Sequence, residues 1–148
     1  MHQDAGFGSN DLRSIGFYSE GNLWVGTGGK GVLRFTGKAF VSYTSQSGIG
    51  SDIVMNVLQD QTGNLGFATY DNGVSKFENG RFVNYGTTAG LSNSRVWSGV
   101  CDAEGNVWFT TSNGVNRITA NGITRFGPDE GLTAKKVTVS MVAADSSV

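Results

Sequence analysis

Short runs of apolar residues alternate with turn-forming residues along the chain. In its central part, four β-rich runs follow one another, with Asp, Asn and Gly residues between them. Helical periodicity is absent, and connections rich in Asx residues and glycine are typical of tight hairpins. The pattern therefore predicts a four-stranded antiparallel meander, with strands at Ile53–Leu58, Asn64–Thr69, Gly73–Phe77 and Arg81–Tyr85.

This unit occurs three times. The similar segments GNLWVGT, GNLGFAT and GNVWFTT begin at Gly21, Gly63 and Gly105, so the copies are 42 residues apart. After Thr111 the third copy is one residue shorter, which a surface turn tolerates. We expect a single domain over residues 1–148, with repeats at about 9–46, 51–88 and 93–129. Residues 136–142 match the first strand of a further unit.

Repeats of this length indicate an all-β fold built from β-propeller blades. Four strands per unit and a period of about 42 residues fit such a blade. The Gly-His and Trp-Asp signatures of WD40 repeats are missing here, and kelch repeats are longer, at about 50 residues. The sequence therefore predicts three four-stranded antiparallel blades plus one extra C-terminal strand, 136–142.

The third copy carries the most complete motif, in the segments Gly90–Ser98, Asp102–Thr111 and Asn113–Ile118. It resembles the two-component-regulator propeller repeat, a family that forms the sensor propellers of bacterial hybrid histidine kinases, often in polysaccharide-utilisation systems. The resemblance implies a non-enzymatic sensor module that binds a carbohydrate or another small molecule. No kinase or DNA-binding segment is recognisable in the sequence, so no signalling output is implied.

One position departs from the pattern. Trp24 and Trp108 stand at strand centres and are predicted to be core residues, whereas Gly66 takes the same place in the middle copy. We expect a larger neighbour, Phe67 or Trp97, to fill the space, so that Gly66→Trp would destabilise the fold. Three cationic residues occupy the same position in the three repeats: Arg34, Lys76 and Arg117. We expect the aliphatic parts of their side chains to be buried, rather than the three charges to form an anion-binding site.

Charge and composition exclude several classes of function. The 148 residues include 23 glycines and one proline, and the net charge is −1 with scattered Lys and Arg, so binding to nucleic acid or to an anionic membrane is not expected. The N-terminal residues lack the features of a signal peptide. As written, the chain is expected to be soluble and cytoplasmic, or periplasmic if it comes from a sensor kinase.

The sequence offers little for catalysis. His2 is the only histidine, which argues against a histidine base, a His-rich metal site and the virginiamycin B lyase type of propeller, which relies on a histidine. Asp60 and Asp102 begin Asp-x-x-Gly-Asn turns rather than calcium loops. We expect no enzyme activity, no cofactor and no metal, and Cys101 as a small core residue. A lyase or hydrolase built on loop carboxylates remains the minor alternative: Asp71, Asp129 and Glu130.

Two sets of loops are expected to share one face of the propeller. They are the connections from a fourth strand into the next blade and the hairpins between second and third strands. A solvated loop face and an assembly unit without a small ligand are the alternatives. Aromatic and Arg residues dominate recognition surfaces, so Tyr70, Arg95 and Trp97 are the foremost candidates. The other candidate ligand-binding residues on this face are Asp71, Lys30, Lys135 and Lys136.

Three blades cannot close a ring, because propellers have typically four to eight. The sequence therefore predicts that the chain associates with itself as a head-to-tail homodimer with six blades. In this arrangement, strand 136–142 crosses to the partner and pairs with its first blade, in place of or beside Leu12–Tyr18. A ragged C-terminal tail is the alternative.

Overall fold

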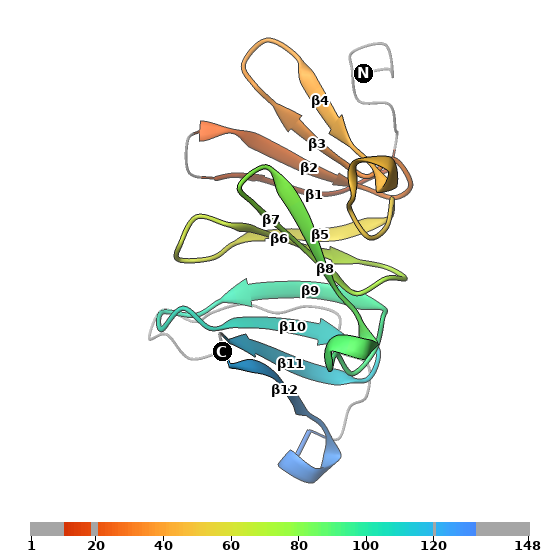
Figure 1. The fold of residues 1–148 in the computed structure, drawn as a ribbon, viewed down its shortest axis with the longest axis vertical. Helices are drawn as coiled ribbons and strands as arrows, with labels where there is room; N and C mark the ends of the chain where they lie inside the picture. The colour runs from red at the N-terminus through yellow and green to blue at the C-terminus, as the bar shows by residue number, and fades with distance from the viewer. Residues whose placement is uncertain (1–10, 19–20, 120, 133–148) are drawn as a thin grey trace.

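The chain is all-β. The computed structural model describes residues 11–18, 21–119 and 121–132, and it contains three four-stranded antiparallel sheets (Figure 1). Each sheet is a meander in which neighbouring strands follow one another in sequence. The strands are β1 Leu12–Phe17, β2 Leu23–Thr27, β3 Val32–Phe35, β4 Phe40–Tyr43, β5 Val54–Gln59, β6 Leu65–Thr69, β7 Val74–Glu78, β8 Arg81–Tyr85, β9 Val96–Cys101, β10 Val107–Thr111, β11 Gly114–Thr119 and β12 Gly122–Phe126.

The sheets correspond to the three predicted repeats, so the predicted fold class is confirmed. We call β1–β4 blade 1, β5–β8 blade 2 and β9–β12 blade 3. The blades lie one after another in a row (Figure 1), and their first strands are neighbours, because β5 contacts both β1 and β9. The expected extra strand at 136–142 lies outside the described residues. Among the described residues, no helix is long and apolar enough to span a membrane.

A single short 3-10 turn follows the last strand of each blade. These turns are η3 Ser45–Ser47, η4 Thr87–Ala89 and η5 Pro128–Glu130, at positions where the sequence analysis expects only loops. Each turn ends at a glycine in the left-handed region, with φ of 110° at Gly48 and 92° at Gly131. A residue with a Cβ atom adopts this conformation only with strain, which explains why a glycine recurs here in every copy.

The recurring Thr at the end of the second strand also has a structural role. The side chains of Thr27, Thr69 and Thr111 are buried. Each hydroxyl donates to the carbonyl of the glycine at or directly before the start of the third strand, over 2.7, 2.7 and 3.0 Å. The recurring Asp is a turn residue, as predicted. Asp102 Oδ1, for example, accepts from the backbone N–H groups of Glu104 and Asn106 over 2.9 Å each. The repeated residues therefore build the blade.

The core lies between the blades. Trp24 is buried as predicted and stacks on Tyr43, with 5.6 Å between ring centroids. It belongs to a cluster between blades 1 and 2 that also contains Phe67. Three expectations about individual residues need correction. Trp108 and Cys101 are expected in the core but are half-buried. Phe67 is expected to fill the space beside Gly66 but packs on the face of its sheet that contacts Trp24.

The space beside Gly66 is therefore not filled as expected. Phe67 faces blade 1, and Trp97 packs against Tyr70 at the edge of the sheet. The larger residue here is Leu58, whose counterpart in blade 1 is Gly16. Its side chain would lie 3.4 Å from a Cβ atom built on Gly66. Side chains on neighbouring residues of a strand point to opposite faces, which is why Phe67 cannot replace an aromatic at Gly66.

Candidate functional site

The two predicted sets of loops lie together on one face of the blades. The 3-10 turns η3 and η4 occupy the same side of the row of sheets (Figure 1). Backbone hydrogen bonds join each hairpin to the connection beside it: Tyr70 N–H donates to the Ile53 carbonyl over 3.0 Å, and Ser112 N–H donates to the Arg95 carbonyl over 3.1 Å. Rigid strands on both sides thus fix the positions of these loop residues.

Tyr70, Arg95 and Trp97 form one contact group, which we call the aromatic cluster. The guanidinium carbon of Arg95 lies 4.4 Å from the Tyr70 ring centroid. The Tyr70 and Trp97 rings meet edge to face, at 5.7 Å and 85°. Trp97 Nε1 donates to Ser112 Oγ over 2.9 Å, which fixes the indole at the end of the hairpin. The three foremost sequence candidates are therefore brought together, across blades 2 and 3.

The cluster occupies positions at which the three copies disagree. Arg95, Trp97 and Ser112 of blade 3 correspond to Ile53, Met55 and Tyr70 of blade 2, and to Asp11, Arg13 and Gly28 of blade 1. We call these nine residues the variable rim. Each set combines two positions at the start of the first strand with one in the hairpin beside it. The scaffold is repeated, but its chemistry at the rim is not.

Sequence reasoning missed Arg13 and Met55. Arg13 Nη1 lies 3.5 Å from Met55 Sδ, and its Nε forms an ion pair with Asp11 Oδ1 at 2.7 Å. The hydrogen bond from Arg13 lowers the pKa of Asp11 and raises the pKa of Arg13 in return. The 42-residue offset that relates Trp97 to Met55 and Arg13 was a usable signal, since it identifies these residues as equivalent.

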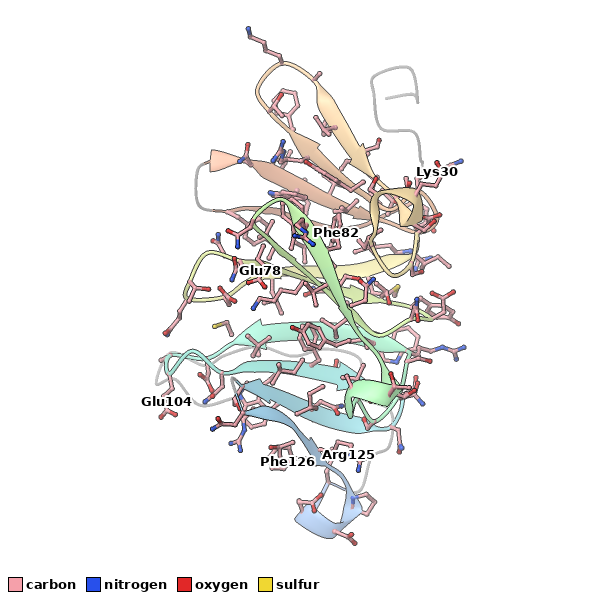
Figure 2. All side chains as sticks on the ribbon, in the orientation of Figure 1. Lys30, Glu78, Phe82, Glu104, Arg125 and Phe126 are labelled. Atoms are coloured by element: carbon pink, nitrogen blue, oxygen red, sulfur yellow. The ribbon has the colours of Figure 1, made fainter. Side chains whose placement is uncertain are left out.

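The remaining candidates lie outside this group. Lys30 and Asp71 are exposed in the β2–β3 and β6–β7 hairpins. Lys30 lies at the loop edge of blade 1, whereas Glu78 and Glu104 lie at the other edge of the sheets (Figure 2). Lys135 and Lys136 fall outside the described residues.

The carboxylates offered as a minor catalytic alternative lie in two different blades, with Asp129 and Glu130 in the turn after blade 3 and Asp71 in blade 2. Glu130 Oε1 accepts from Gly127 N–H over 2.6 Å and so caps its own 3-10 turn, while Asp71 is exposed in the β6–β7 hairpin of another blade. Among the described residues there is no group of three or more His, Cys, Asp and Glu side chains that could hold a metal ion. The aromatic cluster instead presents two half-buried rings and an exposed guanidinium, which are groups suited to recognition.

Solved structures share this architecture. No protein-family model and no curated protein sequence matches the chain. The extracellular domain of a protein described as a hybrid two-component system of B. thetaiotaomicron superposes with a TM-score of 0.84 at 21% identity, over 93% of this chain and 20% of that one. The fold is that of a β-propeller. A second such extracellular domain from this organism gives a TM-score of 0.75 at 23% identity, over 93% of this chain and 21% of that one.

These propellers confirm, at the level of the fold, the resemblance to the two-component-regulator repeat. The chain spans about a fifth of the length of the two extracellular domains. Virginiamycin B lyase from Staphylococcus aureus is a more distant neighbour, with a TM-score of 0.64 at 19% identity, over 78% of this chain and 41% of that one. A His-to-Ala form of that lyase is catalytically inactive.

Proposed function

We propose that this chain is the ligand-binding part of a sensor propeller and that it recognises an oligosaccharide or another small molecule at the variable rim. The observation that carries the proposal is the aromatic cluster. Tyr70, Arg95 and Trp97 come from two blades and meet at positions where the repeat does not prescribe the residue. Scaffold positions repeat because the fold requires them, so divergence at the rim points to recognition.

The chemistry of the cluster suits a sugar. Tyr and Trp rings combine an apolar face with a polar group, and the apolar face can pack on the C–H groups of a pyranose ring. The Arg95 guanidinium adds donors for hydroxyl or carboxylate oxygens. Arg13 lies at the equivalent rim position to Trp97 in blade 1 and supplies a second set of donors. A ligand that spans the rim would contact all three blades.

A binding role is better supported than catalysis. The lyase among the structural neighbours loses activity when a histidine is replaced, and the single histidine of this chain, His2, lies outside the described residues. The other two neighbours are extracellular domains, which favours a periplasmic or extracellular location over a cytoplasmic one.

A thermal-shift screen with oligosaccharides tests this function, because a ligand that binds only the folded state raises Tm. We expect a saturable rise with at least one oligosaccharide. Arg95→Ala should weaken that binding at least tenfold, as expected for a residue at the centre of a recognition surface. Arg125→Ala is the matched control, since Arg125 is also exposed but lies on the outermost strand of blade 3 (Figure 2).

Two results would contradict the proposal. One is a panel of oligosaccharides and small molecules in which none changes Tm, which would favour the assembly unit without a small ligand. The other is a ligand that Arg95→Ala and Trp97→Ala bind as tightly as the parent does, which would place recognition away from the aromatic cluster.

A further inference from the structure

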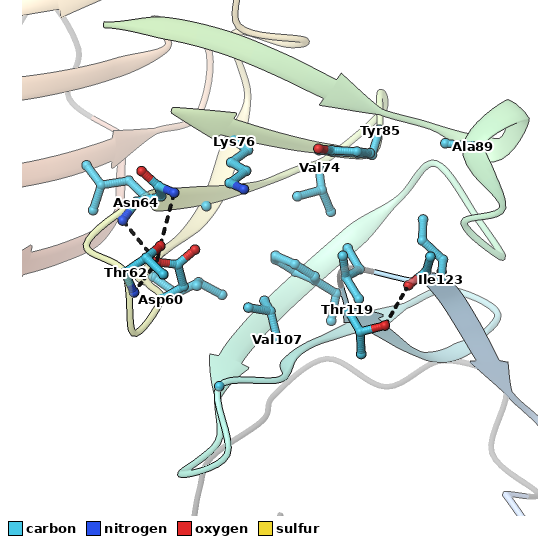
Figure 3. A pocket seen from close by; sticks show the side chains of 17 residues that line it. Asp60, Thr62, Asn64, Val74, Lys76, Tyr85, Ala89, Val107, Thr119 and Ile123 are labelled. Carbon is cyan, nitrogen blue, oxygen red and sulfur yellow. Dashed lines mark hydrogen bonds between the residues drawn. The ribbon is translucent and has the colours of Figure 1, made fainter. Parts of the chain in front are cut away.

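The two interfaces between blades differ in the kind of space that they enclose. Between blades 1 and 2, Trp24 is 3% exposed and its ring centroid lies 5.7 Å from those of Phe67 and Phe77. The pocket of about 440 Å³ that remains beside this ring is bordered by polar residues such as Asn22, Arg34 and Asn64. Between blades 2 and 3, a cavity of about 490 Å³ takes the corresponding place (Figure 3). Its apolar wall consists mainly of Leu58, Val74, Val107, Phe109, Ile118 and Ile123.

Differences between the copies account for the cavity. Gly66 replaces the indole of Trp24, while Ile118 and Ile123 stand where blade 2 has Phe77 and Phe82. Leu58 is larger than its counterpart Gly16, but this one gain does not offset three losses of an aromatic ring. A volume of this size lies in the range of small-molecule pockets, which is about 300–1,000 Å³.

A cation stands opposite the missing ring. In blade 1, Arg34 pairs with Trp24 across β2 and β3, and its guanidinium carbon lies 5.6 Å from the indole centroid. Blade 3 has the same arrangement at Arg117. In blade 2 the cation is Lys76 and the residue opposite is Gly66. Lys76 projects from β7 toward the cavity (Figure 3) and forms an ion pair with Glu78 at 3.4 Å. Leu58 and Phe109 lie 3.4 and 3.5 Å from a Cβ atom built on Gly66, so they border the cavity on this side.

A carboxylate stands where an indole N–H would lie. In blade 3, Trp108 Nε1 donates to Asp102 Oδ2 over 2.9 Å. The other carboxylate oxygen, Asp102 Oδ1, accepts a hydrogen bond from a backbone N–H group of its own turn. Asp60 is the equivalent residue of blade 2 and borders the cavity (Figure 3). Its Oδ1 atom makes the same turn contacts, 2.9 Å from Thr62 N.

We propose that the cavity between blades 2 and 3 binds a free planar heteroaromatic molecule of about the size of indole. Blades 1 and 3 show what such a position holds when it is full: an indole ring beside a cation, with its N–H on a carboxylate in blade 3. Blade 2 retains the cation and the carboxylate and lacks the ring. The site is separate from the variable rim and does not depend on an oligosaccharide ligand.

Calorimetric titration of the 148-residue chain with indole tests the site. We expect saturable binding with one indole per chain and a Kd in the millimolar range or below, as for small apolar ligands that enter preformed cavities. Indene has the same shape but no N–H, so it should bind several-fold more weakly. Asp60→Asn should reduce this preference, whereas Asp102→Asn in blade 3 serves as the matched control.

Filling the cavity should abolish binding. The double substitution Ile118→Phe with Ile123→Phe introduces the two rings that blade 2 carries at these positions, and it should weaken indole binding at least tenfold. Gly66→Trp introduces a ring from the blade 2 side of the cavity and should also weaken binding. A cooperative melting transition verifies that each variant folds. Val41→Phe, on an exposed position of blade 1, is the control for adding an aromatic ring.

Three results would overturn the proposal. The first is the absence of saturable binding to the intact chain. The second is binding that persists in folded variants with the cavity filled. The third is equal affinity for indole and indene together with no effect of Asp60→Asn, because the site would then be an apolar hole without recognition of the N–H group.

Discussion

Leu58 stands directly opposite Gly66 in the antiparallel pair of β5 and β6, whereas blade 1 has Gly16 opposite Trp24. A Cβ atom on Gly66 would lie 3.4 Å from Leu58, and one on Gly16 would collide with Tyr18. In blades 1 and 2 a large residue therefore faces a glycine across the strand pair, and the two positions exchange sizes between these blades. Blade 3 has Val100 opposite Trp108 and does not share this exchange.

This exchange predicts strong coupling between the two positions. Gly66→Trp alone should lower the free energy of unfolding by about 1–3 kcal/mol, because the ring must displace Leu58. Leu58→Gly alone should also destabilise, since it enlarges the cavity. The double variant should be more stable than the sum of the single effects predicts, with a coupling energy of about 0.5–3 kcal/mol. Urea unfolding of all four proteins measures it, and strict additivity would contradict the exchange.

The contact between Arg95 and Tyr70 should be measurable without a ligand. A guanidinium 4.4 Å from a ring centroid at an exposed site is expected to contribute about 0.5–1 kcal/mol. A double-mutant cycle with Arg95→Met and Tyr70→Leu should show this coupling energy. The pair Arg125→Met with Tyr70→Leu is the control, because Arg125 lies on the outermost strand of blade 3 and should show none.

The hydrogen bond from Trp108 should control the ionisation of Asp102. This bond and the backbone donors of the turn lower the pKa of Asp102. Trp108→Phe should move the pKa of Asp102 back toward its ordinary value, which carboxyl carbon NMR across an acid titration measures. Asp11 is the internal control, since Arg13 rather than an indole lowers its pKa.

The direction of the pH effect follows from this lowered value. A carboxyl group with a depressed pKa in the folded state stabilises the fold fully above the pKa of the unfolded chain, about 3.9 for Asp. That contribution is lost as the pH falls through the folded value. The parent protein should therefore lose more stability than Trp108→Phe on acidification below about pH 5. Equal losses in the two proteins would show that the bond does not stabilise the ionised form.

The homodimer with six blades remains a prediction. Ile15 is 69% exposed on β1, and alternation along the strand places it on the opposite side from Gly16 and Trp24, away from blade 2. Because β1 already pairs with β2, strand 136–142 of a partner would have to add to the edge of β1 or displace it. Light scattering should show a dimer that Ile15→Asp weakens, with Val83→Asp as the exposed control.

Two results of the same experiment would contradict this association. A monomeric intact chain at high concentration would exclude the ring of two copies. A version that ends at Thr133 and still dimerises fully would exclude the strand exchange.

The repeated pattern in the sequence was sufficient to predict the architecture of each blade. Strand positions, the hairpins and the order of strands within each blade follow from local patterns, because turn chemistry at Asp60 or Gly73 acts within a few residues. The same reasoning placed Tyr70, Arg95 and Trp97 on one face, since all blades have the same orientation.

Only the tertiary structure decided how neighbouring blades fit together. The alternation of side chains separates Phe67 from Gly66, and the cross-strand register brings Leu58 to Gly66 and Lys76 beside it. The contact of Arg13 with Met55 and the cavity at Gly66 likewise arise between blades. Packing between blades depends on side chains that are about 42 residues apart in sequence, and the shape left between them is not encoded in any single repeat.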